Sequence, residues 1–174
     1  MLDRHYWDDE GGGYYFTADD AEALIVRAKS AADHATPAGN GLMVSLLARL
    51  YFLTGRTDYR SRADALIAAF SGEMAQNFFP LASFMNGVEL LNCARQVVIV
   101  GDRGAADSRS LLRAVFSTCA PNRVVSVIAP DEALPDGHPA HGKTQLGGHA
   151  TAYICIGTTC SMPLTNGVEL AEAL

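Results

Sequence analysis

The hydrophobic pattern of this chain changes its period near Gln96, and that change constrains the fold more than any other feature. Before Gln96, apolar residues recur with the three- and four-residue spacing of amphipathic helices. After it, short runs of β-branched residues have the length and composition of strands. At 174 residues, the chain can bury one ordinary core. We therefore predict an α+β protein with a helical-hairpin region over residues 1–95 and a small α/β region over residues 96–174, packed as one unit.

Four segments of the first region favour helices: residues 21–32, 43–51, 59–70 and 84–91. The second segment has the clearest pattern, because its apolar side chains occupy positions i, i+3, i+4, i+7 and i+8 counted from Met43. The links between the later segments are short. Short links place consecutive helices side by side and antiparallel, so we expect helical hairpins.

The second region is expected to contain a strand, a helix, a second strand, a long surface loop, a third strand and a terminal helix. These cover residues 97–100, 105–118, 124–128, 130–148, 152–156 and 168–174. The first three elements have the order and length of a βαβ unit, which predicts two parallel strands. The loop is rich in Pro, Gly and His.

Composition and charge exclude several classes of partner. The formal net charge is −6 and the 13 basic residues are scattered along the chain, so no cationic stripe is available to neutralise nucleic-acid phosphates. The sequence has no signal peptide and no apolar run of ~18 residues, which predicts a cytoplasmic protein without a membrane partner. Residues 101–104 lie between a strand and a helix, but they match neither G-x-G-x-x-G nor the Walker sequence. We expect no nucleotide and no other cofactor.

A rigid polar turn precedes the clearest helix. Pro37 fixes its own φ, while Gly39 and Gly41 permit backbone angles that other residues avoid. Asn40 is a residue type that caps helices. The turn therefore holds polar groups, Asp33 and Asn40 among them, at a helix entrance. It either shapes a pocket or only reverses the chain.

Four segments, taken in order, resemble the spermatogenesis-associated protein 20 (YyaL-type) family. They are residues 12–17, 33–41, 98–101 and 152–163. The resemblance implies a long protein with an N-terminal thioredoxin-like domain and an α/α toroid similar to six-hairpin glycosidases and sugar epimerases. This chain would be only its carboxyl-terminal fragment or remnant. His34 stands where the family's turn has Gly, and Ala38 and Gly41 stand where it has Ser, so two hydroxyl groups are missing from that turn.

The resemblance raises the possibility of a carbohydrate-active enzyme that works like a glycosidase or an epimerase. Asp33 and His34 would then be the candidate acid/base groups, because carboxylates and imidazoles move protons near neutral pH. Asp33, Asn40 and Tyr14 would be candidate contacts for a carbohydrate-like ligand. The alternative interpretation is a purely structural turn and a surface histidine.

A second hypothesis concerns Cys155 and Cys160, which have four residues between them across a predicted strand and turn. They could form a disulfide, take part in a redox-linked accessory function, or supply half of a metal site. Three histidines precede them, His138, His141 and His149. Because this spacing matches no standard zinc signature, we expect no metal.

The third hypothesis, a non-catalytic structural or interaction module, fits the isolated chain best. A toroid of six hairpins needs about twelve helices, and about four are predicted before the βαβ unit. Helices separated from such a toroid leave apolar surface uncovered. We therefore expect self-association, or packing against the toroid and thioredoxin-like regions that this chain lacks.

Overall fold

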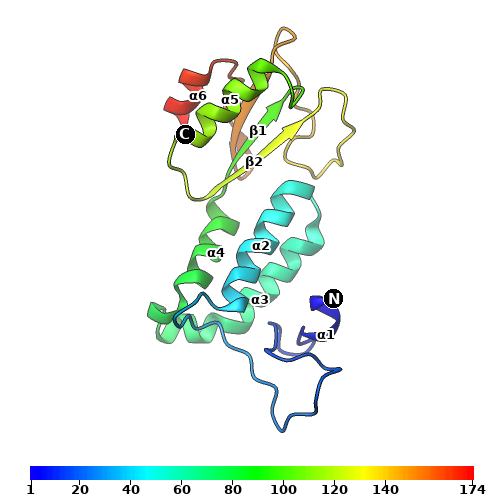
Figure 1. Cartoon of the computed structure of the whole chain (residues 1–174), viewed down its shortest axis with the longest axis vertical. Coiled ribbons are helices and arrows are strands. Elements are labelled where there is room, and N and C mark those ends of the chain that lie inside the picture. The colour runs from blue at the N-terminus through cyan, green and yellow to red at the C-terminus, as the bar shows by residue number, and fades with distance from the viewer. The chain divides into compact units, whose positions relative to one another are not determined.

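The computed structural model describes all residues from 1 to 174, and the chain divides into two compact units (Figure 1). The helical unit contains residues 1–51 and 57–91, and the α/β unit contains residues 52–56 and 92–174. The sequence pattern predicts the division after residue 95, whereas the second unit begins at residue 92 and also includes residues 52–56. None of the helices combines the length and the apolar content needed to cross a bilayer.

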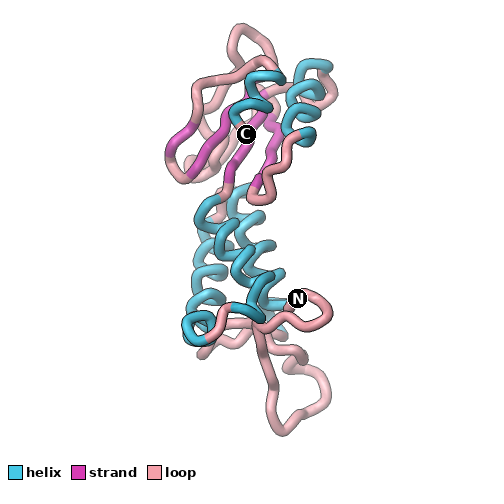
Figure 2. Tube along the Cα trace, turned by 90° about the vertical axis from the view of Figure 1, so that its left-hand side faces the viewer, coloured by secondary structure: helices cyan, strands magenta, loops and turns pink.

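Three helices form the body of the helical unit: α2 (Gly39–Thr54), α3 (Thr57–Gln76) and α4 (Ala82–Cys93), the last preceded by the 3-10 turn η1 (Phe79–Leu81). The predictions of helices within residues 43–51, 59–70 and 84–91 are confirmed. Gly55 adopts a φ of 71°, the left-handed conformation that commonly ends a helix, directly after α2. Figures 1 and 2 show α3 running antiparallel to both α2 and α4.

Close packing between α2 and α4 depends on two glycines. A Cβ atom on Gly41 would collide with the Ser83 hydroxyl, and one on Gly87 would lie 2.8 Å from Cβ of Val44. These approaches bring the two backbones together. On the α3 side, the buried rings of Phe70 and Phe84 meet edge to face with centroids 5.8 Å apart. The core of the unit is therefore apolar and closely packed.

The helix predicted over residues 21–32 is wrong. After the short helix α1 (Leu2–His5), residues 6–38 contain no helix and no named strand. The side chain of Ile25 is fully exposed, so the apolar residues of this segment have no core to pack against. A short helix without a buried face is marginal in water. Instead, Arg27 donates to the carbonyls of His5 and Thr17 at 2.9 and 2.7 Å, and these bonds hold the segment.

The α/β unit is built on a four-stranded mixed sheet with the order β2-β1-β3-β4. Its strands are β1 (Arg95–Val100), β2 (Arg123–Ile128), β3 (Thr151–Ile156) and β4 (Thr159–Cys160). Strand β1 pairs parallel with β2 and antiparallel with β3, and β3 pairs antiparallel with β4. Two helices complete the unit, α5 (Ala106–Ser117) and α6 (Gly167–Ala173). They lie on one face of the sheet (Figure 2).

Strand β1 is buried on both faces, which explains its unbroken apolar run. Val97 and Ile99 pack with Leu111 of α5 and Leu170 of α6. On the other face, Val98 and its neighbours pack against the loop of residues 130–148.

That loop was predicted to lie on the surface, and the prediction is wrong in part. His138 and Ala140 are buried. His138 Nδ1 accepts the amide hydrogen of Ala140 at 3.0 Å, which ties the buried ring to its own loop.

Candidate functional site

An apolar groove of about 450 Å³ opens in the helical unit. It lies between α1, the aromatic residues 14–16 and the first turns of α2. Its exposed apolar side chains are Leu2, Phe16, Leu42 and Leu46. Tyr14 and Asn40, both named as candidate ligand contacts, also line it. Such a cavity suits an apolar occupant rather than a sugar, which needs many hydrogen-bonding groups.

The amide of Asn40 is buried and already hydrogen-bonded. Its Oδ1 accepts the Tyr14 amide hydrogen at 2.8 Å, and its Nδ2 donates to the carbonyls of Tyr14 and Ser30 at 3.0 and 2.9 Å. The side-chain amide of Asn40 therefore hydrogen-bonds to both backbone groups of Tyr14, as a neighbouring β-strand would. Our expectation that Asn40 caps a helix is wrong, because α2 begins one residue earlier and Asn40 lies inside it.

Asp33 links the N-termini of α2 and α4 and does not line the groove. Its Oδ1 accepts the amide hydrogen of Ala38 at 2.7 Å, and its Oδ2 accepts that of Ser83 at 2.7 Å. The Ser83 hydroxyl also donates to Oδ1. Burial opposes ionisation of this carboxyl, but the hydrogen bonds from Ser83 and Ala38 outweigh it and hold the pKa below its ordinary value. Asp33 therefore caps two helices as a carboxylate.

The remaining candidate of this turn, His34, is exposed. It does not line the groove beside Tyr14 and Asn40. The structure thus brings Tyr14 and Asn40 together, and places Asp33 and His34 elsewhere.

The Tyr14 hydroxyl donates to Oδ1 of Asp3 at 2.6 Å. Burial, followed by this hydrogen bond, raises the pKa of Tyr14 above its ordinary value. The ring also meets Trp7 edge to face, with centroids 5.0 Å apart. Tyr14 is therefore neutral at physiological pH and part of the packing.

Two charged clusters in the N-terminal segment could not be predicted from a local sequence motif, because each joins residues that are far apart in the chain. Lys29 donates to Asp8 at 2.6 Å, and this bond is the main cause of a lowered pKa at Asp8. His5, Asp19 and Asp20 place three possible ligand atoms within 4.8 Å of one another. The hydrogen bond between His5 and Asp19, 2.8 Å long, accounts for this arrangement without an ion.

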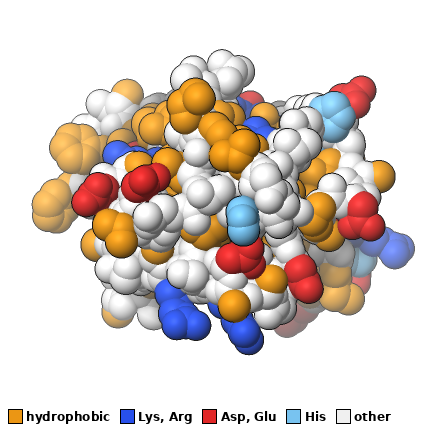
Figure 3. Space-filling model, turned by 90° about the horizontal axis from the view of Figure 1, so that it is seen from above, with side chains coloured by type: hydrophobic (Ala, Val, Ile, Leu, Met, Phe, Trp, Pro, Cys, Tyr) orange, Lys and Arg blue, Asp and Glu red, His pale blue; other side chains and the backbone are white.

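A pocket of about 580 Å³ lies in the α/β unit where β1 and β2 end. Asp102, Asp131 and Glu132 line it beside Arg103. Three carboxylates around one guanidinium make this pocket unsuitable for phosphate. On the face shown in Figure 3, acidic, basic and apolar side chains are interspersed, and no continuous basic area is visible.

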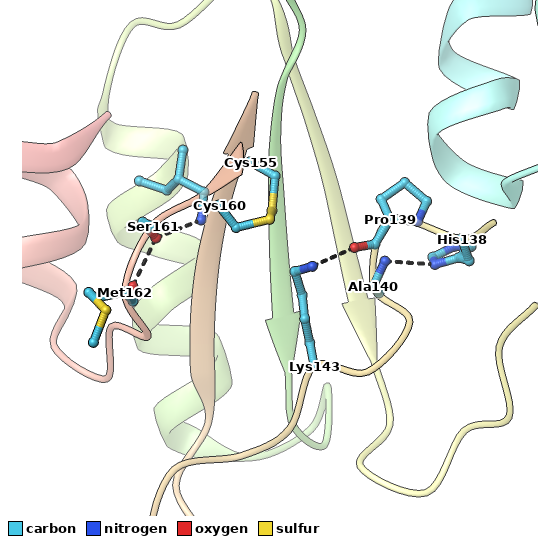
Figure 4. Close-up of a disulfide and its surroundings, with 9 residues drawn as sticks. His138, Pro139, Ala140, Lys143, Cys155, Cys160, Ser161 and Met162 are labelled. Carbon is cyan, nitrogen blue, oxygen red and sulfur yellow. Dashed lines mark hydrogen bonds between the residues drawn. A yellow bond between two sulfur atoms is a disulfide. The ribbon is translucent and has the colours of Figure 1, made fainter. Parts of the chain in front are cut away.

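Cys155 and Cys160 form a disulfide between β3 and β4 (Figure 4). The two residues are direct partners in the antiparallel register, with Cα atoms 4.0 Å apart. Gly157, with a φ of 57°, starts the two-residue turn of this hairpin. The other two cysteines, Cys93 and Cys119, are free and exposed.

These features define a chain with a three-helix unit that has an open apolar groove, and a mixed-sheet unit that carries a cross-strand disulfide. No family model matches the sequence. Over 99% of its length the chain is 32% identical to Spermatogenesis-associated protein 20 of Homo sapiens, and over its whole length it is 32% identical to the protein of that name in Rattus norvegicus. An uncharacterised protein of Caenorhabditis elegans is 27% identical over 99% of the chain. The chain spans only 22 to 24% of the length of these relatives.

Proposed function

We propose that this chain is a non-catalytic interaction module whose helical unit packs against further helices of a longer protein. The observation that carries the proposal is the open groove, where Phe16, Leu42 and Leu46 leave apolar surface uncovered at the start of α2. Exposed apolar surface of this kind marks an interaction site. The occupant is an apolar helix from the part of the longer protein that this chain does not contain.

The comparisons support this choice of occupant. The match covers nearly the whole chain but less than a quarter of each relative, so most of each relative lies outside the matched segment. In the proposal, the chain corresponds to the carboxyl-terminal part of such a protein, and α2, α3 and α4 are part of an α/α toroid. The groove receives the neighbouring toroid helix. A thioredoxin-like domain belongs to the more distant part of the longer protein.

No observation favours the carbohydrate-active alternative. It requires two converging acid/base groups near Asp33. The carboxylate of Asp33 accepts hydrogen bonds from Ala38 and Ser83, and His34 is exposed. We therefore assign both to the turn and do not extend the proposal to a sugar ligand.

A cysteine placed in the groove tests the proposal. Leu46→Cys, with Cys93→Ser, is labelled with a maleimide in the isolated chain and in a chimera where this chain replaces the matched segment of the human relative, both at nanomolar concentration so that self-association does not cover the groove. The native exposed Cys119 is the internal reference. Because a covered side chain must open before it reacts, we expect Leu46→Cys to be labelled about tenfold more slowly in the chimera. Equal rates, relative to Cys119, would contradict the proposed occupant.

The isolated chain has no such cover, so we also expect self-association through the same surface. Light scattering at micromolar concentration should detect a dimer or larger species. Leu42→Glu should shift the chain toward monomer, because it places a charge on the groove wall. A monomeric wild-type chain would count against an exposed docking surface.

A further inference from the structure

One row of side chains crosses the whole sheet of the α/β unit. Gln96 of β1 is the register partner of both Val124 of β2 and Cys155 of β3, and Cys155 is the partner of Cys160 of β4. Direct partners point to the same face, with Cβ atoms about 4.5–5.5 Å apart across antiparallel strands. Gln96 therefore lies immediately beside the disulfide.

The side-chain oxygen Oε1 of Gln96 is the one polar atom of this row that is buried without a hydrogen-bond partner. Gln96 is only 6% exposed, and its Oε1 is buried without a hydrogen-bond partner. A buried acceptor without a donor is unfavourable. The neighbouring disulfide offers no hydrogen, whereas a cysteine thiol is a donor. Reduction of the disulfide would thus create a donor next to the one atom of the row that needs it.

We propose that Cys155 and Cys160 form a reversible thiol–disulfide exchange site, and that Gln96 favours its reduced form by accepting a hydrogen bond from the Cys155 thiol. This inference concerns the α/β unit and is independent of the docking proposed for the helical unit. The reductant is a thiol, either a low-molecular-weight thiol or a protein dithiol. Gln96 is a positioning and tuning residue, and the two cysteines carry the chemistry.

The two sulfurs have different roles because they differ in exposure. Cys160 is exposed on the two-residue edge strand, whereas Cys155 is 2% exposed. A thiolate attacks Sγ of Cys160, a new sulfur–sulfur bond forms, and the Cys155–Cys160 bond breaks. Cys155 leaves as a thiolate and takes up a proton from solvent, and the resulting S–H donates a hydrogen bond to Oε1 of Gln96. A second thiolate then releases Cys160, so two reductant thiols become a disulfide and the protein gains two electrons and two protons.

The hairpin does not depend on the disulfide alone. Ser161 donates its amide hydrogen to the carbonyl of Ile154 at 2.8 Å, and the Ile154 amide donates to the Ser161 hydroxyl at 3.1 Å. These bonds remain after reduction. The exchange can therefore proceed in the folded chain.

The test measures the thiol–disulfide equilibrium of the full chain carrying Cys93→Ser and Cys119→Ser. The protein is equilibrated in buffers of reduced and oxidised glutathione, quenched by alkylation and analysed by mass. Gln96→Met removes the acceptor at similar volume. We expect its equilibrium constant for reduction to fall about fivefold, equivalent to about 20 mV for a two-electron couple.

The matched control is Val98→Ala, which removes packing at the next position on the same face of β1 but leaves Gln96 in place. We expect this variant to keep the wild-type equilibrium. No shift in Gln96→Met, or an equal shift in Val98→Ala, would overturn the role of Gln96.

A second measurement needs only wild-type residues at the site. During reduction by glutathione, the mixed disulfide should be found on Cys160, and circular dichroism should show that the sheet is retained. Glutathione on Cys155, or reduction only after unfolding, would overturn the exchange site.

Discussion

The two units of this chain are stabilised by different kinds of interaction. In the α/β unit, β1 is buried on both faces, and its apolar residues contact helices on one side and a loop on the other. The helical unit also has an apolar core, but its long N-terminal segment depends on polar side chains. Asp33, Asn40 and Arg27 each hydrogen-bond to backbone at a distance along the chain.

The two units should therefore respond to different perturbations. Apolar burial is insensitive to the charge state of single groups, whereas a carboxylate that accepts amide hydrogens is effective only when ionised. We therefore expect loss of apolar volume to affect either unit, and loss of a single polar group to affect mainly the helical unit.

Phe84→Ala should have the largest effect and tests whether the units are independent. Phe84 is fully buried against Phe70, so its truncation should lower the free energy of unfolding of the helical unit by about 3–5 kcal/mol. Hydrogen exchange should show lost protection in α2 to α4 and retained protection in β1 and β3. Phe79→Ala, at an 86% exposed position of the same unit, is the control and should change stability by less than about 0.5 kcal/mol. Equal loss of protection in both units would mean that they unfold together.

Asp33→Ala should have the next largest effect and depends on pH. It removes a charged acceptor shared by two helix N-termini, and we expect a loss of about 2–3 kcal/mol at neutral pH. Because the pKa of Asp33 is lowered by folding, its contribution is present above the unfolded value of about 3.9 and is lost as pH falls through the folded value. Urea denaturation at pH 7 and at lower pH should show the difference from wild type shrinking in acid. His34→Ala is the neighbouring exposed control, and a pH-independent difference for Asp33→Ala would contradict the carboxylate role.

The sequence predicted the regular elements better than the interactions that position them. Helix α2 was predictable because its apolar period is long and Gly55 ends it. Residues 21–32 also looked helical, but helix formation there needed a core that the segment does not reach. The turn around Asp33 is visible in the sequence, yet the role of Asp33 depends on Ser83, fifty residues away, and no local pattern shows such a partner.

The same limit applied to the cysteines. Their spacing left a disulfide, a redox role and a metal site open, and only the pairing of β3 with β4 brings the sulfurs together. Gln96 lies beside these cysteines because of the register in which β1 pairs with β3. These two strands are adjacent in the sheet but far apart in the sequence. The register of a strand is set by which of its faces is buried. A strand buried on both faces is a continuous apolar run, so its sequence pattern does not reveal the register.

Asn166→Ala should have the smallest effect, and it removes a polar cap that lies within the α/β unit. Its Oδ1 accepts the amide hydrogen of Val168 at 2.8 Å at the start of α6, and the buried Leu170 of that helix packs into the sheet core. Loss of one exposed cap should cost about 1 kcal/mol, measured by urea denaturation at pH 7. Asn166→Asp retains an acceptor at the same position and should stay near wild type. If Asn166→Ala lowered the free energy of unfolding as much as Asp33→Ala, burial of Leu170 would be too weak to hold α6 without its cap. Polar interactions would then matter equally in both units.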